Sequence, residues 1–194
     1  MMRIILPEKE NPVLRMPAKN IPVSDIRSPR IQKLITEMKA LLAKEEYGVA
    51  LAAPQIGESL RLFIVSGRAL TRNARNSPDE KHNEIPSHQN GLIPPAQGGS
   101  DLGRDQIYIN PVMVKMSRTK KEKHEGCLSI REKWGIVARA EKVTVRAYDE
   151  KNRQFTRGAS GFLAHVFQHE MDHLDGILYT DKATQMYDEK TEGK

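Results

Sequence analysis

Residues 161–176 read Gly-Phe-Leu-Ala-His-Val-Phe-Gln-His-Glu-Met-Asp-His-Leu-Asp-Gly. The apolar residues of this stretch recur at spacings of three and four, which predicts an amphipathic helix that ends at Gly176. The stretch contains an H-E-x-x-H pattern. Because residues four apart share one face of a helix, His169 and His173 can bind the same metal ion. Glu170 lies about 100° around the helix from His169, close enough to reach a water molecule on that metal.

A pattern this short also arises by chance in ordinary helices, so metal binding requires a third ligand elsewhere. The segment Glu-Gly-Cys-Leu-Ser at residues 125–129 offers one in Cys127, the only cysteine of the chain. A thiolate is a strong ligand for divalent transition metals. Together, Cys127, His169 and His173 would leave one coordination position open for water, which is typical of a catalytic site. The alternative interpretation is that Cys127 is an inert buried thiol, as free cysteines often are.

The composition predicts a soluble globular protein of one domain. The 194 residues are 38% hydrophobic and 29% charged, with a net charge of +6. No apolar run approaches the roughly 20 residues that cross a bilayer, and the first residues match neither a signal nor a transit peptide. A single cysteine cannot form an internal disulfide, so we expect a cytoplasmic protein with no membrane partner. The modest positive charge, without an aromatic-interleaved basic stripe, argues against specific nucleic-acid binding but leaves room for weak ribosome association.

The rest of the chain predicts an α+β fold in which antiparallel strands pack around the metal-binding helix. Residues 28–47 begin with Ser28 as a helix cap and carry a regular apolar stripe, so we expect a helix there. The small-residue segment 48–57 contains one polar side chain, Gln55, and by itself reads as a buried connector. Strands are expected at residues 60–65, 106–114 and 142–148, with a hairpin turn at 149–153 and a further short strand after it.

Regions without a regular pattern are assigned to loops. Residues 67–105 are rich in proline, glycine and polar residues, and we expect a long loop or insertion that is disordered. Residues 1–23 contain four prolines and should form an extended arm. We also expect a basic surface turn at residues 117–123 and a mobile polar tail after about residue 180.

Three segments together resemble the motifs of the peptide deformylase family. These motifs are Gly-x-Gly-x-Ala-Ala-x-Gln, Glu-Gly-Cys-Leu-Ser and Gln-His-Glu-x-Asp-His, and they correspond in the same order to residues 48–55, 125–129 and 168–173. The resemblance covers nearly the whole chain except the insertion and the tail, and three motifs in order make it highly specific. Flanking stretches agree at Asn11-Pro12-Val13-Leu14-Arg15, Ile109-Asn110-Pro111 and Arg139-Ala140-Glu141.

The resemblance implies a metal-dependent hydrolase that removes the N-formyl group from the N-terminal formylmethionine of nascent polypeptides and releases formate. The three ligands would bind Fe²⁺ in a site that Zn²⁺, Ni²⁺ or Co²⁺ can also occupy. Glu170 would take a proton from the attacking water and deliver it to the leaving amine. The Gln55 side-chain amide and the Leu128 backbone N–H would stabilise the oxyanion of the formyl group.

The resemblance also places an extended peptide substrate beside the first motif, as an added strand. Here that segment contains Gly48, Val49 and Ala50. Helical spacing puts Phe162 and Val166 on the metal side of the helix, where with Val49 they would line an apolar pocket for the methionine side chain.

Four departures from the family pattern affect these expectations. Ala50 replaces the second motif glycine and puts a methyl group where we expect backbone to meet substrate, which should weaken or alter the fit. Arg131 stands where relatives commonly have proline, and residues 67–105 are an insertion. His165 lies one turn before His169; a fourth metal ligand there would be crowded, so we expect a histidine at the pocket edge or the surface.

Two other functions stay open on the sequence alone. The H-E-x-x-H pattern is shared with zinc peptidases, although the cysteine ligand and its Glu-Gly-Cys-Leu-Ser context argue against a peptidase. The second alternative is a deformylase-like protein with altered or lost activity that acts as a binding protein. Ala50 and the insertion are its motivation.

Overall fold

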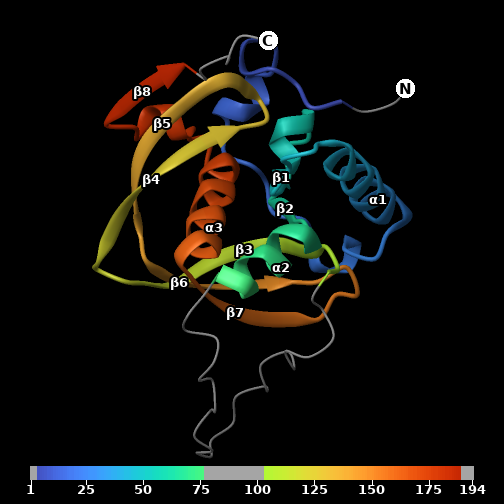
Figure 1. The fold of residues 1–194 in the computed structure, drawn as a ribbon. Helices are drawn as coiled ribbons and strands as arrows, with labels where there is room; N and C mark the ends of the chain where they lie inside the picture. The colour runs from blue at the N-terminus through green and yellow to red at the C-terminus, as the bar shows by residue number, and fades with distance from the viewer. Residues whose placement is uncertain (1–3, 77–102, 189–194) are drawn as a thin grey trace, which may run out of the picture.

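The computed structural model describes residues 4–76 and 103–188 (Figure 1). Helix α3, Gly161–Leu174, lies between two antiparallel sheets, so the predicted helix and the predicted α+β architecture are confirmed. The larger sheet has the strand order β1-β2-β3-β6-β7 and the smaller the order β4-β5-β8. The strands of the larger sheet are β1 Ala50–Ala52, β2 Leu62–Val65, β3 Gln106–Met116, β6 Lys142–Tyr148 and β7 Gln154–Ser160.

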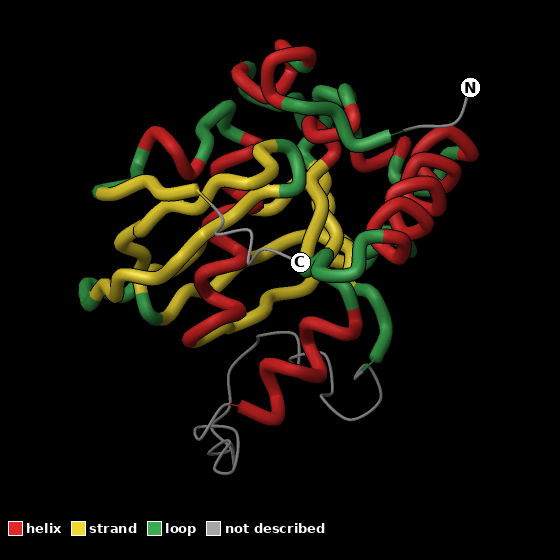
Figure 2. Tube along the Cα trace, turned by 45° about the horizontal axis from the view of Figure 1, so that its top comes forward, coloured by secondary structure: helices red, strands yellow, loops and turns green. Residues whose placement is uncertain are grey.

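The five-stranded sheet is buried on both faces along β2. Phe63 and Val65 of β2 belong to the apolar cluster that includes α3. Leu62 and Ile64 of the same strand belong to a second cluster, with helix α1, Pro29–Lys44. Successive side chains of a strand point to opposite faces, so α1 and α3 cover opposite sides of the sheet. Figure 2 shows α1 to one side of the strands and α2, Gly67–Asn76, beneath them.

The start of α1 is as the sequence predicts. The Oγ of Ser28 accepts a hydrogen bond from the backbone N–H of Ile31 at 3.4 Å, and Pro29 takes the first helical position. The helix ends at Lys44, and the chain turns at Gly48 before β1 begins at Ala50. A Cβ atom on Gly48 would come within 2.9 Å of side-chain atoms of the preceding turn, so the close approach here requires glycine.

The predicted strands are confirmed with small shifts at their ends. β2 begins two residues later than predicted, β3 continues two residues further, and β6 matches the prediction. The turn after β6 is held by Asp149, whose carboxylate accepts hydrogen bonds from the backbone N–H groups of Lys151 (2.9 Å) and Arg153 (2.8 Å). The connector at residues 48–57 contains the edge strand β1 and the short 3-10 helix η4, Ala53–Ile56.

The three-stranded sheet was mostly missed by the sequence analysis. β4, Lys120–Cys127, and β5, Ile130–Ala140, form a hairpin, and β8, Gln185–Asp188, pairs with β5. The surface turn predicted at residues 117–123 is therefore wrong from residue 120 on, and the mobile tail is wrong for β8. The lysine-rich start of β4 and the exposed residues of β8 offer no apolar alternation, so only pairing with β5 makes them strands.

Two loop predictions are corrected as well. Residues 67–76 form α2 instead of a loop, with the Oγ of Ser66 accepting a hydrogen bond from the N–H of Ala69 at 3.2 Å. The rest of the predicted insertion, residues 77–102, lies outside the described residues. The N-terminal arm is not extended throughout, because it includes the 3-10 helices Glu8–Glu10, Pro12–Arg15 and Val23–Asp25. Among the helices described, none has both the length and the apolar character needed to cross a membrane.

Candidate active site

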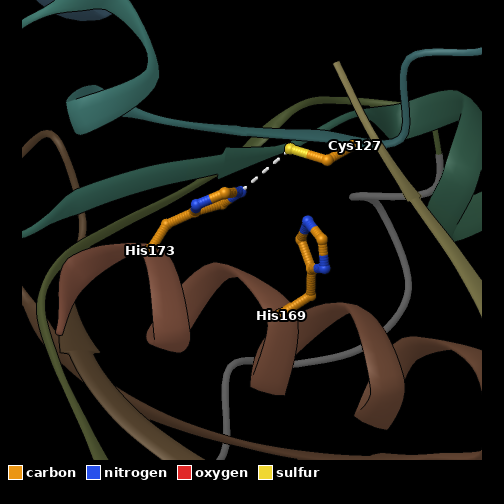
Figure 3. Close-up of side chains that lie close together, drawn as sticks. All are labelled: Cys127, His169 and His173. Atoms are coloured by element: carbon orange, nitrogen blue, oxygen red, sulfur yellow. Dashed lines mark hydrogen bonds between the residues drawn. The ribbon is translucent and has the colours of Figure 1, made fainter. Parts of the chain in front are cut away.

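Three potential metal ligands converge between α3 and the β4–β5 hairpin (Figure 3). The hairpin contributes Cys127, the last residue of β4, and α3 contributes His169 and His173. Their ligand atoms all lie within 4.8 Å of one another, and the Cys127 sulfur is 3.3 Å from Nε2 of His173. Figure 3 shows both rings directed toward the sulfur. One thiolate and two imidazoles suit a divalent transition metal and leave a coordination position open.

Glu125 fixes the orientation of His169. Its Oε2 lies 2.9 Å from Nδ1 of His169, and because a carboxylate only accepts hydrogen bonds, Nδ1 carries the proton. Nε2 of that ring is then free to face the ligand cluster. Glu125 also accepts hydrogen bonds from Nε (2.7 Å) and Nη2 (3.0 Å) of Arg139. Burial acts to raise the pKa of Glu125, but contacts with His165, His169 and Arg139 outweigh burial and hold it well below the usual range.

Arg139 joins Glu125 to a second buried carboxylate, Asp172 of α3. The Nη1 atom of Arg139 donates to Oδ2 of Asp172 at 2.5 Å, and Nζ of Lys182 donates to Oδ1 at 2.7 Å. Two carboxylates thus pair with the buried Arg139 and the exposed Lys182 beside His169 and His173, which offsets the unfavourable burial of Glu125, Arg139 and Asp172. Sequence analysis quoted Glu125 and Arg139 within family-like segments but assigned them no role, because partners this far apart in sequence leave no local pattern.

His165 corrects a prediction. The sequence predicts a histidine at the pocket edge or the surface, whereas its side chain is only 8% exposed. Nε2 of His165 lies 2.5 Å from Oε1 of Glu125. The ring is buried because a carboxylate on the facing strand accompanies it. His165 is not among the three residues of the ligand cluster.

Glu170 lies next to the first ligand histidine and is 3% exposed. Its Oε2 is buried and has no hydrogen-bond partner among the described residues. Burial raises the pKa of the Glu170 carboxyl to about 7, against the opposing charge of His169. A buried carboxyl oxygen without a partner is suited to meet a reactive water molecule or a substrate group.

The two ligand histidines have opposite pKa shifts. Burial lowers the pKa of His173 well below its usual value, so the ring stays neutral, which is the form that binds metals. Burial also acts to lower the pKa of His169, but contacts with Cys127 and Glu125 outweigh burial and raise it well above the usual value.

Gln55 directs its amide N–H group toward the ligand cluster. Its side chain is 2% exposed, and its Oε1 accepts a hydrogen bond from the backbone N–H of Ala52 at 2.8 Å. This leaves Nε2 3.5 Å from both the Cys127 sulfur and the Ser129 hydroxyl. The one polar residue of an apolar segment therefore lies beside the ligand cluster, on a short helix that follows β1.

The remaining residues that the sequence singled out lie in different surroundings. Ala50 and Val166 are buried in the cluster around α3, and Val49 packs against it. The Phe162 side chain is 41% exposed and is not part of that cluster. Gly48 precedes β1, Leu128 lies in the β4–β5 turn next to Cys127, and Arg131 is exposed with Nη2 3.4 Å from Glu45.

Tyr179 is a site residue that sequence analysis missed. Its ring stacks against His169, with ring centroids 6.1 Å apart and planes inclined by 28°. Its hydroxyl donates to the backbone carbonyl of Lys133 in β5 at 2.8 Å. Tyr179 stands at the start of a polar segment, where the sequence offers no pattern that would associate it with the metal ligands.

Comparisons with known proteins agree with the geometry. The family model described as polypeptide deformylase matches residues 3–189. A peptide deformylase of Desulforudis audaxviator (strain MP104C) is 33% identical over 180 residues, which make up 93% of this chain and 93% of the relative. The solved structure of a peptide deformylase from Legionella pneumophila has a TM-score of 0.70 at 32% identity and covers 95% of this chain and 87% of that one. A peptide deformylase from Synechococcus elongatus in complex with actinonin has a TM-score of 0.68 at 27% identity, covering 95% and 81%.

A hydrolase that depends on a bound metal is the class of protein that this fold and site define. Within that class, the match over nearly the whole chain is decisive, and the chain belongs to the polypeptide deformylase family. It is an enzyme that removes the N-formyl group from nascent polypeptides. The family and the activity predicted from three motifs are confirmed.

Proposed function

We propose that Cys127, His169 and His173 bind the catalytic metal, and that Glu170 transfers the protons of the reaction. The observation that carries this proposal is the convergence of three ligand atoms within 4.8 Å beside a buried carboxylate, that of Glu170, whose Oε2 has no hydrogen-bond partner among the described residues. When bound, a divalent metal supplies Lewis-acid chemistry that activates water and polarises the formyl carbonyl. Fe²⁺ is the proposed metal in the cell; one thiolate and two imidazoles also suit Zn²⁺, Ni²⁺ and Co²⁺.

Glu170 acts first as a base and then as an acid. It accepts a proton from the water that attacks the formyl carbon, and it delivers this proton to the amine as the carbon–nitrogen bond breaks. The products are formate and a peptide with a free N-terminal methionine. The burial of Glu170 supports this role, because a base shielded from bulk water keeps the proton in the site.

Two donors stabilise the negative charge that develops on the formyl oxygen. Gln55 provides its side-chain Nε2, which is held near Cys127 by the bond between Oε1 and Ala52. The backbone N–H of Leu128 is the second proposed donor, from the turn that follows Cys127. Donors that are fixed before the reaction need no reorganisation as the charge forms.

The substrate is a formylmethionyl peptide that pairs with β1 in an extended conformation. β1 is the last strand of its sheet, and its outer edge has no strand partner among the described residues. The methionine pocket involves Val49 and Val166, with Phe162 at its exposed side. The methyl group of Ala50 is buried in the α3 cluster, so it projects from the face of the sheet and leaves the pairing edge clear.

This position of Ala50 weakens the alternative that the chain is a binding protein with lost activity. That alternative rested on two features, and interference of Ala50 with the substrate was one of them. The other, the insertion, falls largely on residues 77–102 outside the described part. Action in the cytoplasm and weak ribosome association are further parts of the proposal. Actinonin, which is bound to the Synechococcus elongatus relative, should inhibit this enzyme in competition with a formylmethionyl peptide.

The test of the mechanism is the Glu170→Ala variant. Because none of the three proposed ligands is changed, we expect it to retain one metal per chain, as measured by elemental analysis after gel filtration. Formate release from a formyl-Met tripeptide by the nickel-loaded protein should fall by about 10²- to 10⁴-fold. An exposed carboxylate of β4 gives the matched control, Glu122→Ala, which should keep wild-type turnover. Substantial activity of Glu170→Ala with metal bound would contradict the assigned role.

A further inference from the structure

His165 is a buried histidine to which the proposed mechanism gives no role. It lies one helical turn before His169 and is enclosed by the protein. Burying an imidazole is unfavourable unless a polar partner accompanies it. The partner here is Glu125, whose Oε1 is 2.5 Å from Nε2 of His165. Because a carboxylate oxygen only accepts, this approach is favourable when Nε2 carries the proton.

Glu125 divides its two oxygens between the two histidines. Oε1 faces His165 and the Nε atom of Arg139, whereas Oε2 faces His169 and the Nη2 atom of Arg139. Both rings reach one carboxylate because residues four apart lie on the same face of a helix. The His165 contact is short but not ideally directed for a hydrogen bond, so attraction between the ring N–H and the negative charge contributes much of it.

We propose that His165 is a positioning residue for the metal ligand His169 and that it acts through Glu125. A carboxylate held on both oxygens cannot turn away from His169, so this ring keeps Nδ1 toward Glu125 and Nε2 toward the ligand cluster. This inference rests on the proposed metal site. Residues that orient a ligating histidine typically change metal affinity by about 10- to 100-fold, and we expect about tenfold for His165, which is one contact further away.

The experiment compares His165→Met with His165→Gln. The two side chains have nearly the same length and shape, but glutamine has an amide N–H that can donate to Glu125 and methionine has none. Metal-free proteins are titrated with Co²⁺ in competition with a chelator, and the visible absorption of bound cobalt is recorded. We expect His165→Met to bind Co²⁺ about tenfold more weakly than the wild type, with a changed cobalt spectrum. His165→Gln should recover most of the affinity.

His124→Met is the matched control for this comparison. His124 is an exposed histidine of β4 that contacts the Tyr187 hydroxyl, so its loss should leave Co²⁺ affinity unchanged. In the Glu125→Gln background, adding His165→Met should cause little further loss, because both changes interrupt the same route to His169. If the two substitutions lower the free energy of Co²⁺ binding additively in the double variant, action through Glu125 is contradicted.

The outcomes separate this proposal from the proposed function. If the wild type binds Co²⁺ and both His165 variants bind it equally tightly, His165 only fills space and the proposal is wrong. If the wild type itself does not bind Co²⁺, the metal site is wrong and the proposal falls with it. Should His165→Met not fold, the nitrogen resonances of the zinc-loaded wild type decide the question. We expect His165 protonated at Nε2 and His169 at Nδ1, and a proton found only on Nδ1 of His165 would overturn the proposal.

Discussion

The amide of Gln55 is oriented by the backbone of its own segment. Its oxygen accepts a hydrogen bond from the N–H of Ala52, and this turns the amino group toward Cys127 and Ser129. An amide in water would have to reorient as charge develops on the substrate. Here the orientation is set when the protein folds, so as an oxyanion donor Gln55 would contribute to the rate and little to substrate affinity.

The Gln55→Glu variant tests this arrangement. It keeps the shape and the acceptor for Ala52 but replaces the donor near Cys127 with a carboxylate oxygen. We expect kcat for formate release to fall by about 10²- to 10³-fold while KM changes little. Steady-state kinetics on a formyl-Met tripeptide measure both constants. Gln154→Glu, at an exposed position of β7, is the control and should behave as wild type; a wild-type kcat for Gln55→Glu would remove Gln55 from the mechanism.

Residues whose chemistry is local were accessible from the sequence, and residues defined by their partners were not. The H-E-x-x-H spacing is a property of one helix, so His169, Glu170 and His173 could be selected without any knowledge of the fold. The role of Glu125 depends on a contact with His169, 44 residues away, and that of Tyr179 on the stacking of its ring against His169. Such contacts are set by the tertiary structure alone.

At the scale of elements, α3 ends where the chain passes close to the N-terminal arm. Gly176 has a φ of 75°, and a Cβ atom on it would lie 2.9 Å from the backbone carbonyl carbon of Arg15. The left-handed conformation is unfavourable for other residues, and a backbone atom cannot move aside as a flexible side chain can. Glycine at this position therefore allows α3 to end and the arm to pack beside it.

We expect Gly176→Ala to lower the free energy of unfolding by about 2 to 4 kcal/mol, the sum of a strained backbone and a steric clash. Urea denaturation followed by circular dichroism measures this change. Gly158→Ala is a suitable control, because a Cβ on this residue of β7 would meet nothing within 4 Å. That variant should be as stable as the wild type or slightly more stable. Equal stability of both variants would show that the close approach at Gly176 is not needed.

The same distinction between local and non-local information explains which elements were predicted. α1 and α3 have apolar stripes and terminal signals, and β6 has strict alternation, so each was found with nearly correct ends. β4 and β8 are exposed and charged or polar along most of their length, and they are strands because β5 lies between them. Edge strands of this kind carry little pattern of their own.

Across the whole molecule, the ligand cluster joins two separate parts of the fold. Cys127 belongs to the three-stranded sheet, whereas His169 and His173 are on the helix that packs against the five-stranded sheet. A bound metal would therefore act as a cross-link between them. Because the unfolded chain has no preformed site, the free energy of metal binding adds to the stability of the folded state.

Metal removal should consequently lower the melting temperature. At a free metal concentration of 100 times Kd the stabilisation is about 2.7 kcal/mol, which for a chain of this size corresponds to about 5 to 10 °C. Calorimetry with and without Ni²⁺ measures the shift. Cys127→Ala removes the proposed ligand of the three-stranded sheet, so in this variant Ni²⁺ should raise the melting temperature much less. An equal shift in that variant would mean that the metal binds to α3 alone.

The position of β8 in the chain has a consequence for the order in which the enzyme matures. β8 pairs with β5, which forms a hairpin with the strand that ends at Cys127, yet it follows both histidines in sequence. During translation Cys127, His169 and His173 leave the ribosome before β8, the strand that completes the sheet carrying Cys127. The sheet that carries Cys127 is therefore complete only after residues 185–188 have emerged and paired with β5.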